Sequence, residues 1–417
     1  MKELYLLLLL LLSLISVSKI NAQKDNKKLQ FYGDFRFRTE YDWNSKNSSS
    51  SSNDGVGKRE DRFRLRYRMR FGAVYNWNEN IQLGLRLRTG VPTSIQSPHV
   101  NFGYKGFGMV PFNLDKIYFK YQKGDYWGWV GKNSFPFWKQ NELFWDDDVT
   151  PEGLVFGAKY KTGAVEFAPT VAYFMANNIP VEGNSSSPFN GSGTGFGNGD
   201  NYGEIIGAQL KLTHKKDNYQ GIASVGYYGM SGIFTSTELS FDASGSTGSY
   251  LSLDYNFLMA SLQYKVSSLI SEKWPVTIGY DIVSNLEDYS DNKYSQTFND
   301  LGFRDELKDQ TTSHTASLAI GRSKDKGDWQ FAYYYAHKEM FSVVSYFTED
   351  DWVRWGNIHA NRNTNYGGHE FRMVYTIGKD FNIVARYYNV EALQRRMASD
   401  DQLESGNRFR VDLNIKF

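Results

Sequence analysis

Five arginines occupy every second position of one short segment. They are Arg62, Arg64, Arg66, Arg68 and Arg70, and apolar or aromatic residues fill the positions between them. Successive side chains of a β-strand leave on opposite faces, so the alternation predicts a strand with one charged and one apolar face. A guanidinium group stays charged at any relevant pH. The segment therefore supplies a permanent row of positive charge.

The next segment repeats the pattern and completes a hairpin. After a short polar turn at 78–80, apolar residues alternate with Gln82, Gly84, Arg86 and Arg88. A helix would scatter the arginines around its circumference, which excludes the helical alternative. On this hairpin alone, an amphipathic sheet over a soluble core remains an open alternative.

Residues 1–22 are expected to form a signal peptide. Lys2 precedes an apolar run from Leu4 to Val17, and Ala22 offers a cleavage point. An uncleaved membrane anchor is the alternative, although the run is short for a spanning helix. The chain has no cysteine, which excludes disulfides, thiolate metal sites and a lipoprotein anchor.

Residues 23–417 are expected to form one domain, a transmembrane β-barrel. The mean hydropathy is −0.53 and 22% of the residues are charged, yet 16% are aromatic. A barrel reconciles these values, because only alternate residues touch lipid and aromatic girdles mark the two interfaces. The net charge of +1 gives no support to a nucleic-acid partner.

The alternation of apolar and polar residues continues along the chain and predicts an all-β fold, a single antiparallel barrel of sixteen strands. Short turns alternate with long polar connections, as in outer-membrane barrels. Two strands keep the alternation less cleanly, so fourteen or eighteen strands remain open. The predicted strands are 29–42, 61–76, 80–90, 113–122, 126–133, 153–161, 164–176, 203–214, 218–230, 252–266, 275–286, 312–322, 328–339, 367–377, 380–391 and 407–417.

The last predicted strand ends the chain on Phe417, at an apolar position of the alternation. It resembles the terminal strand of bacterial outer-membrane barrel proteins, which is their signal for assembly. That resemblance implies outer-membrane lipid and the barrel-assembly machinery as partners. The sheet must close, because lipid does not tolerate an open sheet edge.

If the apolar face of each strand is turned to lipid, the charged face is turned to an aqueous lumen. Antiparallel order brings the last strand beside the first and gathers the basic residues on one side, which we call the arginine wall. Its predicted pore-lining members are Arg36, Arg38, Arg62, Arg64, Arg66, Arg68, Arg70, Arg86, Arg88, Lys116, Lys120, Arg372, Arg386, Arg408 and Arg410. Nearby carboxylates could instead hold these residues in a rigid paired network with no role in permeation.

The third long connection contains FPFWKQNELFWDDDVTPEG, from Phe135 to Gly153. Its aromatic density is too high for a freely solvated loop, which indicates that it packs against something. Together with RFRLRYRMRFG, LRLRTG and LDKIYFKY, this segment resembles the family described as putative porins of Gram-negative bacteria, including Bacteroidota. It is also similar to alginate-export-type barrels.

The resemblance implies a cell outer membrane location and passive transport. Porins of sixteen strands fold their third loop into the barrel, so the resemblance makes Asp146, Asp147 and Asp148 candidates for a constriction that faces the arginine wall. An outer loop whose aspartates are solvated or bind a divalent cation is the alternative. The sequence does not decide whether three copies assemble into a homotrimer.

The expected function is passive diffusion of small hydrophilic solutes with a preference for anions. A channel specific for acidic oligosaccharides or polysaccharides, and a structural or adhesion barrel with a blocked lumen, are the alternatives. No enzyme activity, metal or cofactor is expected, because the six histidines are scattered and neither HExxH nor GxSxG occurs.

Overall fold

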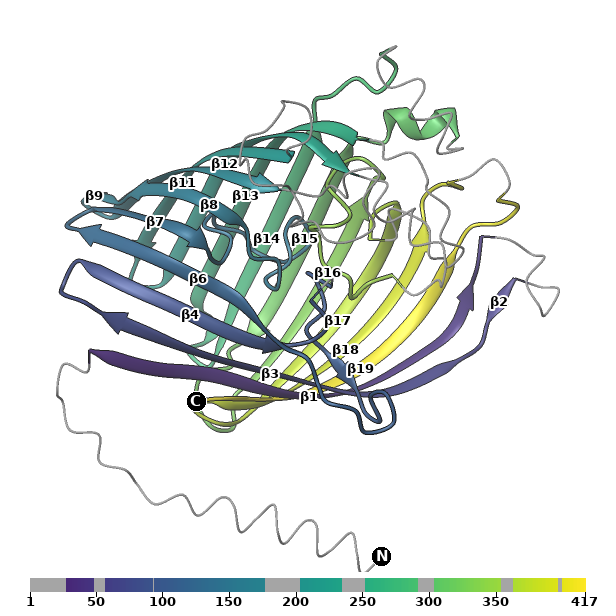
Figure 1. Cartoon of the computed structure of the whole chain (residues 1–417), viewed down its shortest axis with the longest axis horizontal. Coiled ribbons are helices and arrows are strands. Elements are labelled where there is room, and N and C mark those ends of the chain that lie inside the picture. The colour runs from purple at the N-terminus through teal and green to yellow at the C-terminus, as the bar shows by residue number, and fades with distance from the viewer. Residues whose placement is uncertain are drawn as a thin grey trace, which may run out of the picture.

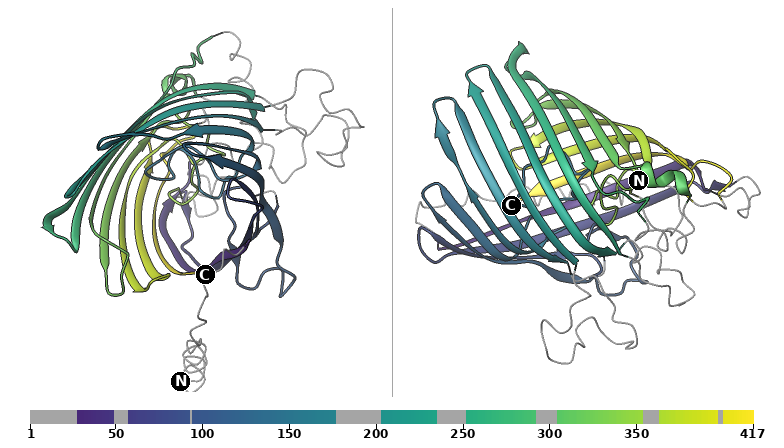
Figure 2. Two further views of the ribbon diagram at one scale, coloured as in Figure 1. Left: turned by 90° about the vertical axis from the view of Figure 1, so that its left-hand side faces the viewer. Right: turned by 90° about the horizontal axis from the view of Figure 1, so that it is seen from above.

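The computed structural model describes residues 28–48, 57–92, 94–176, 203–234, 252–291, 304–353, 363–396 and 400–417. The predicted signal peptide, residues 1–22, lies outside them. All described strands belong to one sheet that curls into a barrel (Figures 1 and 2). Within the described residues, no helix is long and apolar enough to cross a membrane.

Sixteen long strands build the wall, which confirms the predicted number. They are β1 (Leu29–Lys46), β3 (Arg62–Asn76), β4 (Ile81–Thr89), β6 (Phe112–Lys123), β7 (Tyr126–Lys132), β8 (Glu152–Ala158), β10 (Val165–Ala176), β11 (Gly203–Lys216), β12 (Tyr219–Phe234), β13 (Ser252–Ser271), β14 (Trp274–Asn285), β15 (Thr312–Gly321), β16 (Trp329–Lys338), β17 (Tyr366–Gly378), β18 (Phe381–Ala392) and β19 (Ser405–Lys416).

Four short elements complete the described secondary structure. The strand β2 (Lys58–Arg59) pairs with the outer end of β1, and β5 (Val100–Asn101) pairs with β3. The strand β9 (Tyr160–Thr162) follows β8 and pairs with the same neighbour, β10. A 3-10 helix, η2, spans Asp305–Asp309.

The barrel closes between its first and last strands. The strand β1 pairs antiparallel with β3 on one side and with β19 on the other. At the seam, the Gly33 N–H donates to the Phe417 carbonyl at 2.9 Å, and the Phe417 N–H donates back to the Gly33 carbonyl at 3.1 Å. Closure satisfies the edge groups of both strands, as a hydrocarbon environment requires.

The two faces of each strand differ as the alternation predicts. On β11, Ile206 and Leu210 point outward and are 56% and 39% exposed, whereas Ile205 and Gln209 point inward and are 2% and 6% exposed. Apolar side chains exposed on the outside are stable there because the surrounding medium is lipid. The long β-strands therefore give the barrel an apolar exterior, with which it crosses the membrane.

Two connections fold back into the barrel. The third-loop segment, residues 133–151 between β7 and β8, meets the second inner segment, residues 339–353 between β16 and β17. Trp145 and Phe347 stack between them with ring centroids 4.8 Å apart. The inward-facing Tyr228 and Phe257 of β12 and β13 pack against the third-loop residue Phe144. This contact explains the less regular alternation of β13, whose inner face is partly apolar because loops cover it.

Candidate functional site

Strand register assembles the arginine wall from distant parts of the sequence. Arg386 of β18 lies opposite Arg410 of β19, and Arg410 lies opposite Glu40 of β1. Glu40 in turn lies opposite Arg64 of β3. Strand order thus places the two ends of the chain side by side and gives a continuous basic surface across β17, β18, β19, β1, β3 and β4.

Carboxylate side chains lie between these arginines and form ion pairs with them. Arg38 donates from Nε to Asp412 Oδ1 at 2.7 Å and from Nη1 to Asp351 at 3.3 Å. Arg408 donates from Nε to Asp42 at 2.7 Å. The further ion pairs of the wall are Arg62 with Asp42, Arg64 and Arg408 with Glu40, Arg68 and Arg70 with Asp34, Arg86 with Asp115, Arg372 with Glu370, and Arg410 with Asp351 and Asp412.

Pairing is uneven along the wall. The Arg36 Nε donates to the Asn414 Oδ1 at 2.6 Å, and among the described residues no carboxylate lies within ion-pair distance of Arg36. Arg66 donates to the Ser97 hydroxyl at 2.9 Å, and its guanidinium lies 3.9 Å from Glu40. In the register Arg36 faces Arg68 and Arg38 faces Arg66, so Arg36 and Arg66 lie diagonally across β1 and β3.

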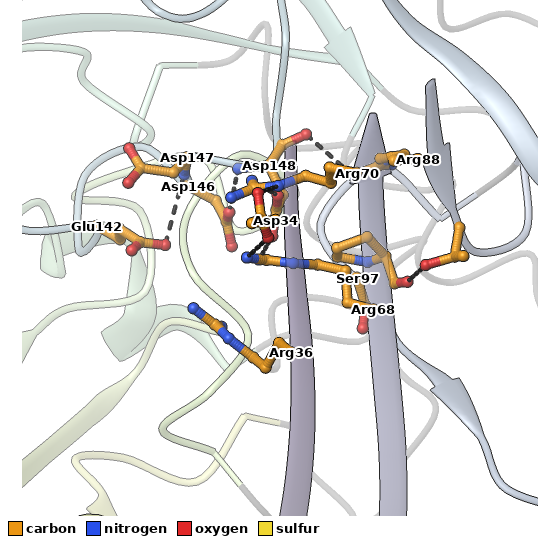
Figure 3. A network of polar contacts seen from close by, with 12 residues as sticks. Asp34, Arg36, Arg68, Arg70, Arg88, Ser97, Glu142, Asp146, Asp147 and Asp148 are labelled. Carbon is orange, nitrogen blue, oxygen red and sulfur yellow. Dashed lines mark hydrogen bonds and ion pairs between the residues drawn. The ribbon is translucent and has the colours of Figure 1, made fainter. Parts of the chain in front are cut away.

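The third-loop segment meets the wall through Asp148. Arg70 Nη1 lies 2.9 Å from Asp148 Oδ1, and Arg68 Nη1 lies 3.5 Å from Asp148 Oδ2 (Figure 3). Arg88 donates to the Asp148 backbone carbonyl at 3.2 Å. Burial opposes ionisation of Asp148, but the attraction of Arg68 and Arg70 outweighs burial and lowers the pKa of its carboxyl group to about 2. The carboxylate therefore stays charged across the physiological range and anchors the loop to the wall.

The other two aspartates differ from the expectation that all three face the wall. Asp147 is paired with Lys139 at 2.5 Å, and its side chain is 65% exposed. Asp146 is buried and accepts the backbone N–H of Asp148 at 2.7 Å (Figure 3). Burial, followed by repulsion from Glu142 and Asp148, raises the pKa of Asp146 well above its usual range. Of these three aspartates, only Asp148 forms ion pairs with wall arginines among the described contacts, because successive loop residues point in different directions.

The opposite end of the third-loop segment is fixed to the far wall. Gln140 and Asn141 both donate to the Asp281 carboxylate of β14 at 2.8 Å. The Trp138 N–H donates to the inward-facing Gln209 side chain at 2.8 Å. The segment therefore bridges the interior from β3 to β11 and β14.

The two predicted lysines differ in position. Lys116 lies opposite Arg86 in the register, and its ammonium group donates to the Ser134 hydroxyl. Lys120 lies opposite Gln82, near the short turn of its hairpin, and no ion pair to it occurs among the described residues. The structure thus groups Lys116 with the arginines and separates Lys120 from them.

The sequence did not single out the second inner segment. The buried residues Met340, Phe341, Val344 and Phe347 are apolar in a connection otherwise expected to be solvated. That apolar content is the same signal that marked the third-loop segment as packed. Asp351, which pairs with Arg38 and Arg410, also enters the site from this segment.

The described residues contain no cluster of histidine and acidic side chains that could hold a metal ion. A closed barrel of sixteen antiparallel strands with an apolar exterior and a charged interior defines a porin-type channel protein of the outer membrane. The chain belongs to the family described as "Putative porin", whose model matches residues 22–247.

One of two similar solved structures shows the same fold at a TM-score above 0.5. The high-pH structure of Pseudomonas putida OprB is 14% identical, covers 94% of each chain and has a TM-score of 0.54. The Salmonella typhi OmpF complex with daunomycin is 10% identical, with a TM-score of 0.49 and coverage of 93% of this chain and 97% of that chain. No curated protein matches the sequence.

Proposed function

We propose that this porin-family barrel is a passive pore for small hydrophilic solutes and that it favours anions. The observation that carries the proposal is the charge balance of the arginine wall. Twelve of its thirteen arginines form ion pairs with eight carboxylates among the described residues, so the arginines of the wall outnumber these carboxylates by five. An excess of fixed charge in a water-filled, low-dielectric passage raises the local concentration of ions of opposite sign.

The pairing has a second consequence for permeation. A fully paired arginine has little charge to offer a passing solute, whereas Arg36 faces the interior without an acidic partner among the described residues. In Figure 3 it lies apart from Arg70 and Asp148. We therefore expect anions to interact chiefly with Arg36 and its neighbour Arg66, rather than with all members of the wall equally.

A specific observation supports a second candidate, a barrel with a blocked lumen. The two inner segments share an aromatic cluster that includes Phe135, Phe144, Trp145 and Phe347, and this cluster occupies space inside the barrel. A third candidate is a channel specific for acidic oligosaccharides or polysaccharides, whose carboxylates would contact successive arginines.

Conductance in planar bilayers separates these candidates. The purified protein is inserted, and the reversal potential is measured across a KCl gradient. Anion selectivity supports the proposal, cation selectivity contradicts it, and the absence of any conductance favours the blocked barrel. Block of the current by an oligouronate, but not by a neutral glycan of the same length, would favour the specific channel.

Assembly and location complete the proposal. We expect the terminal strand ending at Phe417 to be recognised by the barrel-assembly machinery, and the apolar belt to lie in outer-membrane lipid. A homotrimer is tested by the mass of the protein in mild detergent, where a monomer mass would contradict it.

A further inference from the structure

A polar cavity lies inside the barrel, away from the arginine wall. It has a volume of about 550 Å³ and lies between the third-loop segment and the short turns of β6, β8 and β11. Six aromatic rings and three lysines line it, and we call it the turn-side chamber. These residues are Tyr118, Trp127, Trp129, Phe135, Phe137, Trp138, Lys120, Lys159 and Lys211.

Two of the rings lie over glycines of the barrel wall. A Cβ atom added to Gly84 of β4 would be 2.2 Å from Tyr118 Cζ, and one added to Gly157 of β8 would be 2.4 Å from Trp127 Cζ2. Both glycines lie opposite the covering residue in strand register. Each ring therefore covers the lumen side of a glycine, and both residues line the chamber. The glycines make room for the rings at positions where any side chain would collide with them.

The loop side of the chamber is held in place by hydrogen bonds. The Trp138 N–H donates to Gln209 Oε1 at 2.8 Å, and Gln209 Nε2 donates back to the Trp138 carbonyl at 2.9 Å. Phe137 is buried and its ring lies over Gly207 of β11. The aromatic surfaces are thus preorganised and lose little conformational entropy when a ligand binds.

The charge of the chamber is basic. Lys211 has one acidic neighbour, Glu166, at 3.9 Å. No ion pair to Lys120 or Lys159 occurs in the part of the chain that the structure describes. The lining of the chamber therefore combines three ammonium groups with six aromatic rings and little compensating charge.

We propose that the turn-side chamber binds small anions that carry a ring with a flat apolar face. Aromatic faces hold such rings by stacking or by contact with C–H groups, and the lysines hold the acidic group. A sugar acid in its ring form and an aromatic carboxylic acid share this chemistry. The site is distinct from the arginine wall, and binding to it does not require that the barrel conduct.

Isothermal titration calorimetry on the full-length barrel in detergent tests the proposal with four probes. Glucuronate is a ring with an acid, benzoate is an aromatic acid, gluconate is an open-chain sugar acid, and glucose is a neutral ring. At least one of the two ring acids should bind about 10-fold more tightly than gluconate and glucose. Which ring acid binds identifies the natural class of solute. Equal affinity for gluconate, or no binding of either ring acid, overturns the proposal.

Variants locate the binding. Trp127→Ala and Tyr118→Ala should each weaken binding of the ring acid by roughly 2- to 10-fold, the range measured for aromatic pairs. The matched control is Tyr32→Ala, because Tyr32 covers Gly72 in the same way but does not line the chamber. Lys120→Gln combined with Lys159→Gln should remove the preference for ring acids over glucose. Unchanged affinity in the ring variants, or equal loss in Tyr32→Ala, overturns the assignment.

The calorimetric result is independent of conductance. If the barrel binds ring acids but passes no current, the chamber proposal is supported and the pore proposal is contradicted. If the barrel conducts but does not bind ring acids, only the chamber proposal is contradicted.

Discussion

The carboxylate of Asp148 lies 2.9 Å from the guanidinium of Arg70, although 78 positions separate the two residues in the chain. Arg70 belongs to the wall strand β3, and Asp148 belongs to the third-loop segment between β7 and β8. Asp34 shares Arg70 and Arg68 with Asp148, so two carboxylates meet two arginines. This cluster joins the third-loop segment to the barrel wall.

Asp148→Asn should detach the third-loop segment from the wall and raise anion preference, because it removes a negative charge from the interior. The loss of stability is expected to be on the order of 1.5–3 kcal/mol, the range for a hydrogen bond to a charged group. Reversal potential and thermal unfolding measure the two effects. Asp147→Asn is the matched control, since that side chain is 65% exposed and paired only with Lys139 among the described residues. Equal effects of the two substitutions would contradict the role of Asp148.

Arg36→Gln and Arg38→Gln should separate permeation from stability. Arg36 has no acidic partner among the described residues, so its removal should lower anion preference while the melting temperature changes little. Arg38 is 2% exposed and paired with Asp412 and Asp351, so its removal leaves Arg410 as the remaining arginine partner of both carboxylates. The expected cost is about 1.5–3 kcal/mol, the range for hydrogen bonds to charged groups. Circular dichroism melts and bilayer selectivity provide the measurements. A large selectivity change in Arg38→Gln alone would refute this division.

The raised pKa of Glu349 predicts that the folded protein loses stability as the pH becomes alkaline. Burial, followed by repulsion from Asp351, Glu142 and Glu370, raises its pKa to about 8. A carboxyl group whose pKa is raised on folding contributes stability below its unfolded value of about 4.3, and that contribution is lost as pH rises through about 8. Thermal unfolding should therefore occur at lower temperature at pH 9 than at pH 7.

The control for this pH effect is Glu349→Gln, which keeps the shape of the neutral carboxyl group. It should reduce the difference in melting temperature between pH 7 and pH 9. Hydrogen exchange over 339–353 should also rise with pH in the native protein and less in the variant. The same pH difference in both proteins would show that another group titrates.

Trp145→Ala should loosen both inner segments together. Trp145 is 1% exposed and stacks on Phe135 and Phe347, so its removal leaves a cavity between the segments at a cost of about 3–5 kcal/mol. Hydrogen exchange should increase over 133–151 and 339–353 while the barrel strands remain protected. Trp77→Ala, at a residue that is 62% exposed, should change neither segment. Increased exchange confined to 133–151 would mean that the second inner segment is held independently.

The sequence alone determined the barrel, because the constraint that creates it is local. Each strand must alternate apolar and polar residues to separate lipid from water, and each register pair follows from antiparallel neighbours. The sixteen strands, the closure of β19 on β1 and the inward position of Arg62 to Arg70 could therefore be predicted. The aromatic density of Phe135 to Trp145 also predicted that the third-loop segment packs against something.

Only the tertiary structure decided which charges meet. The pairing of Asp148 rather than Asp147 with Arg70 depends on loop backbone directions that have no sequence period. The apolar residues of 339–353 indicate that this segment packs, but only the fold shows that its partners are the third-loop segment and β12 to β14. The turn-side chamber likewise needs Tyr118 to lie over Gly84 and Trp127 over Gly157, which are contacts between neighbouring strands. Side-chain placement of this kind is settled by packing between distant segments, because alternation fixes only the face on which a residue lies.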